Sequence, residues 1–259
     1  MHVTFSLTDK PSIRLPFERY ASTPAINPAN SYEATGVLHN AIFDYVAKEL
    51  TAERYYGSDP CLDSIIRATL NVVKDSHLWE LGCVCVIAEG CPCRDFIDWI
   101  LANFPSAPNE SSSAISRKDI PLQRPSRAEI EKFVLTHIPD CDRNSFLTPF
   151  NELFDNIDRL SADEGSIRAF QKAVVGIEAS ILNAHIAPLP RQILLITTSV
   201  ARHSLFLAFS GGRDTAAIPE WLTSDAAGAS IGVVIGGPKG GLIGATIFSL
   251  ATVVGVPGW

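Results

Sequence analysis

A chain of 259 residues has enough material for one large domain or two small ones, each with a hydrophobic core. Apolar residues make up 46% of it and charged residues 19%, which is typical of a somewhat apolar globular protein. The net charge of −7, without any Lys/Arg-rich run, excludes nucleic acid as an expected partner and repels anionic lipid headgroups.

The N-terminus has no basic start followed by an apolar run, so it does not match a secretory signal. We therefore expect a cytoplasmic protein by default, with membrane association or signal-independent export as alternatives. The six cysteines of such a chain are expected to be reduced rather than joined in disulfide bonds.

The N-terminal half predicts an irregular arm followed by helices. Residues 1–30 are rich in Pro, Ser, Thr and Asn and show no sustained period. Apolar residues at helical spacing predict helices at 30–50, 61–76 and 94–104. The stretch "HLWELGCVCVIAEG", residues 77–90, fits either a buried strand or a short helix.

A Ser/Pro-rich stretch at 105–125 is the best candidate for a linker. Beyond it, two capping boxes predict helix starts, because a Ser side chain caps the first turn and a Glu three residues later reaches back to it. Ser126 with Glu129 opens one such helix, and Ser161 with Glu164 opens another.

Two further segments, 145–160 and the long apolar run 190–210, are expected to be helical. Arg202 and His203 lie in the middle of the second. A central core helix with these two residues at a polar edge is favoured over a membrane span, because an arginine at mid-bilayer is costly.

The C-terminal tail places glycine at every fourth position of an apolar segment. Residues four apart lie on one face of a helix, so this period predicts a bare face about 24 Å long at ~1.5 Å rise per residue. Each glycine costs ~0.8–1 kcal/mol relative to alanine, and five cost ~4–5 kcal/mol, which is tolerable only if another backbone packs closely against them. The predicted helix-packing residues are Gly228, Gly232, Gly236, Gly240 and Gly244.

The sequence leaves open what packs against this face. Residues 231–254 are long enough to span a bilayer, and Lys239 is their only charge. Pro238 and Lys239 argue against one straight span, because proline kinks a helix and a charge inside a bilayer is expensive. "GGPKGG" is also a plausible turn between two apolar arms. Residues 226–254 are therefore predicted either to associate with a membrane or with other copies, or to form a buried core hairpin.

Signals for chemistry are weak. Two Cys-x-Cys pairs, Cys83 with Cys85 and Cys91 with Cys93, supply four thiols, but structural zinc sites usually use Cys-x-x-Cys. We favour small buried residues that flank a turn over a metal site, and we expect no cofactor. No hydrolase or nucleotide-binding motif is present and no catalytic set follows from spacing, so a non-enzymatic protein is expected.

Two segments resemble bacterial sequences. The tail resembles the glycine zippers of bacteriocin-like and other membrane-active bacterial proteins, in which Gly-x-x-x-Gly repeats allow close helix packing in or on a membrane. The stretch "NPANSYEATGVLHNAIFDYV" resembles the opening helix of a group of uncharacterised bacterial proteins with an N-x5-G-x-x-HN pattern. Asn30, Gly36, His39 and Asn40 match that pattern, and it implies no activity.

Together these features predict a mainly α fold: a helical domain with an irregular N-terminal arm and a C-terminal glycine-zipper helix or helical hairpin. The expected regions are an N-terminal helical region at 1–104, a linker at 105–125, a helical region at 126–221 and a glycine-zipper tail at 222–259. The first functional hypothesis is a non-enzymatic bacterial protein whose tail mediates membrane association or self-assembly, as in an effector or a bacteriocin-like toxin. The alternative is a soluble helical interaction or regulatory module whose tail is buried as a core hairpin.

Overall fold

The computed structural model describes residues 25–54, 62–75, 125–161, 163–210 and 217–254. These residues form helices and contain no strand, which confirms the mainly α prediction for this part of the chain. The elements in chain order are α2 (Glu33–Arg54), α3 (Leu62–Asp75), α5 (Arg127–Leu135), the 3₁₀ helix η2 (Asp140–Asp142), α6 (Arg143–Asp158), α7 (Glu164–Asn183), α8 (Pro188–Ser210) and α9 (Ile218–Val254).

Most of the predicted helices correspond to observed ones, with ends that differ by a few residues. The helix expected at 94–104 and the ambiguous stretch at 77–90 lie outside the described residues, as does nearly all of the expected linker at 105–125. Residues 25–32, which precede α2, contain no helix or strand, as expected for the end of an irregular arm.

Side-chain caps set the starts of two helices. The predicted capping box of α5 is present, with Ser126 N donating to Glu129 Oε2 at 2.7 Å and Glu129 N donating to Ser126 Oγ at 3.3 Å. For α7 the expected cap was wrong. Asp163 rather than Ser161 is the N-cap, and its carboxylate accepts from Ser166 N at 2.8 Å. An acidic cap also interacts favourably with the positive end of the helix dipole, so it competes well with the serine two residues earlier.

Buried aromatic rings line one face of α6. Phe146, Phe150 and Phe154 are each spaced by four residues, and their ring centroids are 5.1 and 4.7 Å apart. Spacing of four places them on the same side of the helix, and all three are buried. This stripe gives α6 its packing face against the rest of the core.

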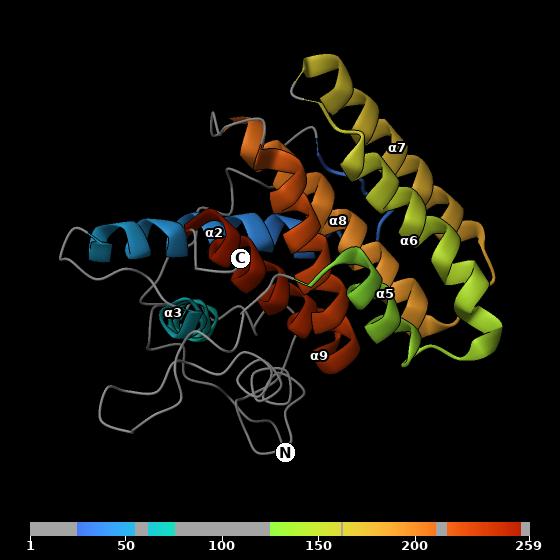
Figure 1. Cartoon of the computed structure of the whole chain (residues 1–259), viewed down its shortest axis with the longest axis horizontal. Coiled ribbons are helices and arrows are strands. Elements are labelled where there is room, and N and C mark those ends of the chain that lie inside the picture. Colours follow the sequence, from blue (N-terminus) through green and yellow to red (C-terminus); the bar gives the residue numbers. More distant parts are fainter. Residues whose placement is uncertain (1–24, 55–61, 76–124, 162, 211–216, 255–259) are drawn as a thin grey trace, which may run out of the picture.

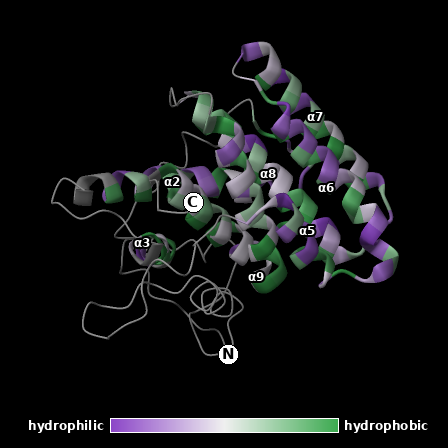
Figure 2. Cartoon of the chain, viewed as in Figure 1, coloured by the Kyte–Doolittle hydropathy of each residue, from purple (hydrophilic) through white to green (hydrophobic). Residues whose placement is uncertain are grey.

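The apolar helices α8 and α9 occupy the middle of the described structure (Figure 1). The helix α2 crosses behind them, α6 and α7 lie along one side, α3 packs on α2 and α9, and α5 packs on α9. Figure 2 shows hydrophilic residues concentrated on α6 and α7, and few of them on α9. One hydrophobic core runs through the described helices and includes residues on both sides of the expected linker.

Candidate functional site

The C-terminal element α9 is a helical hairpin. Its backbone leaves the helical region at Gly236 (φ −127°, ψ 16°) and at Gly237 (φ 63°, ψ −156°). The conformation of Gly237 is open to glycine and strained for other residues. Pro238 follows, where its fixed φ and missing N–H suit the first turn of a helix. "GGPKGG" is thus a turn between arm 1 (218–235) and arm 2 (238–254).

Glycines bring the two arms into backbone contact. A Cβ atom built on Gly232 would lie 2.0 Å from the carbonyl oxygen of Gly240, and a Cβ on Gly228 would lie 2.2 Å from that of Gly244. Gly232 and Gly240 are each four residues from Gly236, and Gly228 and Gly244 are each eight residues from it. A period of four that continues through the turn therefore places glycine opposite glycine along the interface.

Four of the five predicted helix-packing glycines thus meet inside one chain. Gly236 does not share their helical face, because its φ and ψ place it in the turn. Arm 2 fills the bare face of arm 1 at the two contacts described above. Self-assembly through the same glycines would therefore require the arms to separate first.

Side-chain hydrogen bonds close the open end of the hairpin. The indole Nε1–H of Trp221 donates to Ser249 Oγ, and Thr252 Oγ1 donates to Ser224 Oγ at 2.7 Å. The Trp221 ring also packs on Phe43 of α2 with ring centroids 5.3 Å apart. Polar groups that face each other across the arms are paired within the hairpin, which reduces the cost of surrounding it with apolar groups.

The hairpin packs against α8, which is buried along nearly its whole length. The hydroxyls of Thr197 and Ser230 are 2.9 Å apart, so a polar contact joins α8 to arm 1. A Cβ on Gly241 would lie 3.2 Å from Ile196 Cγ2, so arm 2 also approaches α8 closely. The expectation of a central core helix for this segment is confirmed.

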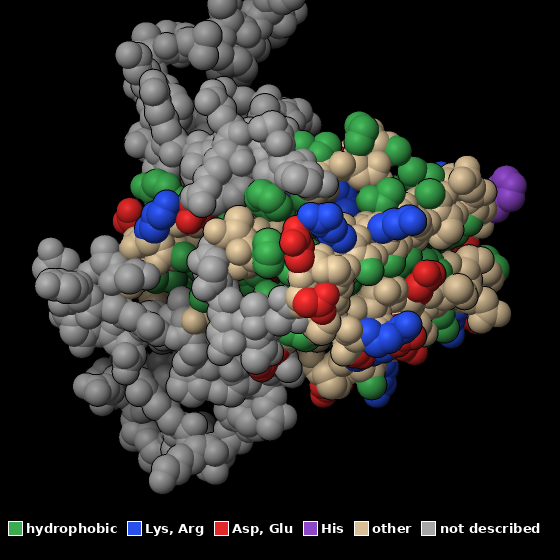
Figure 3. All heavy atoms as spheres, turned by 90° about the horizontal axis from the view of Figure 1, so that it is seen from above, with side chains coloured by type: hydrophobic (Ala, Val, Ile, Leu, Met, Phe, Trp, Pro, Cys, Tyr) green, Lys and Arg blue, Asp and Glu red, His purple; other side chains and the backbone are tan. Residues whose placement is uncertain are grey.

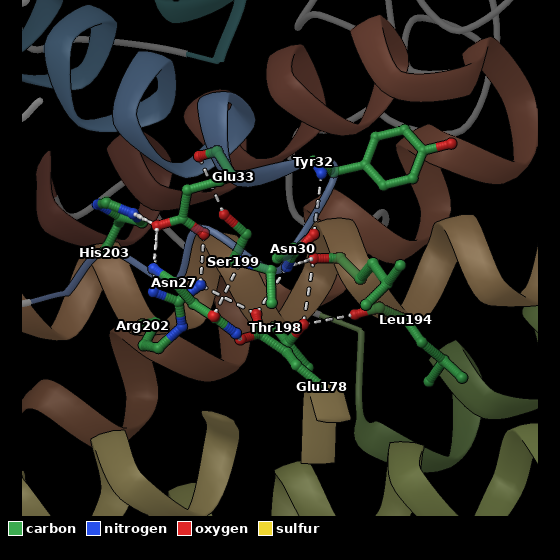
Figure 4. A network of polar contacts seen from close by, with 12 residues as sticks. Asn27, Asn30, Tyr32, Glu33, Glu178, Leu194, Thr198, Ser199, Arg202 and His203 are labelled. Carbon is green, nitrogen blue, oxygen red and sulfur yellow. Dashed lines mark hydrogen bonds and ion pairs between the residues drawn. The ribbon is translucent and has the colours of Figure 1, made fainter. Parts of the chain in front are cut away.

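A buried network of charged side chains, the carboxylate–arginine network, joins α2, α7 and α8 (Figure 4). Arg202 donates to Glu33 Oε2 at 2.5 Å and to Glu178 Oε1 at 3.0 Å. His203 Nε2 lies 2.7 Å from Glu33 Oε1, and because an ionised carboxylate only accepts, this nitrogen carries a proton. Arg202 and His203 are 1% and 0% exposed, so they lie inside the core rather than at the expected polar edge. Carboxylates from α2 and α7 pair with Arg202 there, and the α2 carboxylate also accepts from His203.

Two asparagines extend this network into the segment before α2. Asn27 Nδ2 donates to Glu178 Oε2 at 2.7 Å, and Asn30 Nδ2 donates to Glu178 Oε1 at 2.7 Å. Asn30 Nδ2 also lies 2.9 Å from the carbonyl oxygen of Leu195 on α8. Each oxygen of the fully buried Glu178 carboxylate therefore has an amide donor, as a buried charge requires.

A second polar cluster, the His39 junction, lies where α2, α8 and α9 meet. His39 Nδ1 is 3.1 Å from Asn40 Oδ1 and 3.4 Å from Ser204 Oγ, and its Nε2 is 3.8 Å from Asp225 Oδ2. Asn40 Nδ2 donates to the carbonyl oxygen of His203 at 2.8 Å, which turns Asn40 Oδ1 toward the His39 ring. All of these side chains are buried.

The residues of the N-x5-G-x-x-HN pattern all face α7 or α8. Asn30 binds Glu178, and His39 and Asn40 belong to the His39 junction. A Cβ on Gly36 would lie 2.7 Å from the carbonyl oxygen of Ser199, so only glycine lets α2 approach α8 this closely. In this chain the pattern thus serves to dock α2 on the central helix.

The two clusters shift the pKa values of groups on α2. Burial raises the pKa of Glu33, but hydrogen bonds from His203 and Arg202 and their positive charges outweigh it, so its pKa is lowered overall. Burial lowers the pKa of His39 to about 4, although a hydrogen bond with Asn40 opposes the shift. At neutral pH Glu33 is therefore ionised and His39 is neutral.

Ser204, His39 and Asp225 are the residue types of a hydrolytic triad, but they do not form an accessible one. The His39 Nε2 to Asp225 Oδ2 distance of 3.8 Å is too long for a hydrogen bond, and all three residues are 0% exposed. Ser204 lies well inside α8, where a substrate carbonyl has no access to its hydroxyl. The cluster is built to hold helices together rather than to attack a substrate.

The weak metal candidates Cys83, Cys85, Cys91 and Cys93 lie outside the described residues. Within the described ranges, no three His, Cys, Asp or Glu side chains are grouped as a metal site requires. Cys141, in η2, is exposed.

Sequence reasoning did not single out the partly buried acid Glu33 or the buried acids Glu178 and Asp225. A usable signal exists for Glu178, which follows Val174 by four residues and precedes Ile181 by three, so the helical period assigns it to the buried face of α7. An acidic residue on such a face predicts a buried cationic partner. Only the fold identifies that partner as Arg202.

The chain matches no known protein family, no curated protein and no solved structure.

Proposed function

We propose that this chain is a non-enzymatic protein whose α9 hairpin is a membrane-associating element. The helices that pack against it, α2, α3, α5, α6 and α8, form a shell that holds the hairpin until it is released. The observation that carries the proposal is the glycine contact between the arms. The contacts at Gly228 and Gly232 belong to the hairpin alone and need no side chain from the other helices. Contacts between small residues hold helices together in lipid, where no hydrophobic effect acts between them.

The dimensions of the arms support the proposal. Arm 1 has 18 residues, counted from 218 to 235, and arm 2 has 17, counted from 238 to 254. At ~1.5 Å per residue each arm is about 26 Å long, close to the ~30 Å hydrocarbon core of a bilayer. Glu220 and Lys239 lie in the first turn of their arms, near the membrane surfaces in such an arrangement. By length and composition, α8 and α9 are the two helices of the described part that could cross a membrane.

The alternative, a soluble interaction or regulatory module, is supported by how well the hairpin is covered. In the most apolar window of α9, 72% of the residues are buried by the rest of the chain. Figure 3 shows acidic and basic side chains interspersed on the described part of one face, without a broad basic patch for anionic lipid. Membrane association under this proposal therefore depends on release of the hairpin rather than on surface charge.

Vesicle flotation of the full chain tests the proposal. Phosphatidylcholine vesicles are used, at neutral pH with and without mild urea and over a range down to acidic pH, so that the shell is loosened in two independent ways. We expect co-flotation once the shell is loosened. Val234, half-buried near the tip of arm 1, is changed to Asp, and Val175, 39% exposed on α7, receives the same change as a matched control.

Val234→Asp is expected to reduce co-flotation several-fold, because a carboxylate near the hairpin tip must enter or cross the bilayer. Val175→Asp is expected to float like the unmodified chain. A chain that stays with the aqueous fraction under every condition, or two variants that float equally well, would favour the soluble module instead.

A further inference from the structure

His39 is fully buried between the shell and the hairpin. Its ring lies on α2, Ser204 contacts it from α8, and Asp225 faces it from arm 1. Its neighbour Asn40 holds the His203 carbonyl oxygen, so the same turn of α2 is tied to α8. A positive charge on this imidazole would therefore change the electrostatic contacts of α2, α8 and α9 together.

The packing around this ring leaves little space for water. His39 is 0% exposed, and so are Asn40, Ser204 and Asp225 around it. The Phe43 ring lies on the same side of α2, with its centroid 6.2 Å from that of His39. A proton bound by His39 would enter a junction that cannot hydrate it without opening.

The charged groups around His39 come from each helix packed against it. On α8, Arg202 and His203 are held by Glu33 of α2, and Arg202 is also held by Glu178 of α7. On arm 1, Asp225 faces His39 Nε2 across 3.8 Å. The helix α3 also packs on α2 and α9, but its one described charged side chain, that of Arg67, is exposed to solvent.

We propose that His39 is an acid sensor: its protonation opens the junction of α2, α8 and α9 and frees the hairpin to bind a membrane. The inference rests on the proposed function of the hairpin. Burial lowers the pKa of His39 to about 4, from an ordinary value of 6.5. A group with a lowered folded-state pKa stabilises the fold above its unfolded pKa, and this contribution is lost as the pH falls from about 6.5 toward 4. The lowered pKa of Glu33 adds a loss of stability of the same sign, but only as the pH falls below its ordinary value of 4.5.

The test compares the full unmodified chain with His39→Gln, which keeps a polar side chain but does not titrate, and with His185→Gln at an exposed position. An environment-sensitive hydrophobic dye reports opening without lipid, and flotation with phosphatidylcholine vesicles reports membrane binding, both from pH 7.5 to 4. We expect opening of the unmodified chain and of His185→Gln at the same pH. For His39→Gln the midpoint should move at least about one pH unit lower, because its main titrating group is gone.

The two readouts separate the acid sensor from the membrane function. A shifted dye midpoint without vesicle binding at any pH would support the sensor and contradict the membrane proposal. Vesicle binding with equal midpoints in all three proteins would overturn the sensor and leave the membrane proposal intact. Opening at a higher pH in His39→Gln than in the unmodified chain would also overturn it, because Asp225 would then be stabilising the protonated ring.

If His39→Gln does not fold, the unmodified chain still decides the question. Hydrogen exchange at the imidazole C2 position, followed by mass spectrometry of the His39 and His185 peptides, reports the protonation of each ring. The sensor requires that His39 stay neutral until the dye signal rises, and that it protonate together with opening. A His39 ring that titrates near its ordinary pKa in the closed protein would refute the proposal.

Discussion

Replacing Gly232 by alanine should destabilise the protein even though alanine is the better helix former. The added Cβ would lie 2.0 Å from the Gly240 carbonyl oxygen, and such contacts are essentially never closer than 3.0 Å. The arms must therefore part by about 1 Å at this level. The obstacle is backbone in a second helix, so no rotamer change can relieve it.

The magnitude follows from two opposed terms. Overpacking of a tight interface costs ~1–3 kcal/mol, and rigid backbone on both sides places this case near the upper end. The gain in helix propensity is ~1 kcal/mol. The net expectation is a loss of about 2 kcal/mol, which corresponds to a melting temperature about 4–8 °C lower for a protein of this size.

Gly176 provides the matched control. It lies inside α7, and a Cβ atom built on it meets nothing within 4 Å. Gly176→Ala should therefore show the propensity gain alone and raise the stability by up to ~1 kcal/mol. Thermal melts followed by circular dichroism compare the two variants. Shifts of the same sign would mean that the arms are not in backbone contact, and the reasoning about the glycine period would be refuted.

Three further predictions concern charges and caps. Arg202→Met should lower the free energy of unfolding in urea by ~3–5 kcal/mol, because the buried Glu178 and the partly buried Glu33 lose their cation. Arg168→Met, which breaks an exposed pair, should change it by less than ~1 kcal/mol. The free energy of unfolding should fall by up to ~3 kcal/mol as the pH is lowered from 6.5 to 4, because the pKa of His39 is lowered to about 4 and each pKa unit corresponds to ~1.4 kcal/mol. A stability that does not change with pH over this range would contradict this prediction. Asp163→Ala should lower the free energy of unfolding in urea by ~1 kcal/mol, and Ser161→Ala should lower it clearly less, because Asp163 is the residue that caps α7. The opposite order would mean that Ser161 is the cap.

Local signals in the sequence were sufficient to predict where most of the described helices lie. Spacing of apolar residues predicted the segments that become α2, α6 and α8, because an amphipathic helix must present its apolar residues to the core wherever that core lies. The cap of α5 was predicted for the same reason, since Ser126 and Glu129 are three residues apart and their contacts with each other are local. These features need no knowledge of the fold.

The partners of buried charges could not be predicted in this way. Arg202 meets Glu33, which is 169 residues away in the sequence, and Glu178, which is 24 residues away. No period links these positions, because they lie on three different helices. Arg202 was therefore expected at a polar edge of the core helix, because an arginine without a known partner is rarely buried.

The glycine period predicted a close helix contact, but it did not identify the segment that packs against the glycines. Bare faces of the same spacing serve two arms of one chain, two copies of a chain, or two spans in a membrane. What selects the first here is the turn at Gly237, whose positive φ reverses the chain and brings arm 2 back along arm 1. The sequence sign of this reversal is the "GGPKGG" segment and not the glycine period, because five equally spaced glycines are symmetric about the middle one in a straight helix as well.

The contacts between the hairpin and the shell differ in how well a membrane could replace them. Lipid tails are as apolar as the side chains of α8 and α2, so the apolar part of this interface would be exchanged at little cost. Polar contacts cannot be exchanged in the same way, since a hydroxyl or carboxylate in hydrocarbon lacks a partner. Two of those that cross the interface in the described part of the chain are Thr197 with Ser230 and His39 with Asp225. If the hairpin is released as we propose, these polar contacts are the ones that must be broken at a cost, and His39 is the one among these four side chains whose ordinary pKa lies near neutral pH.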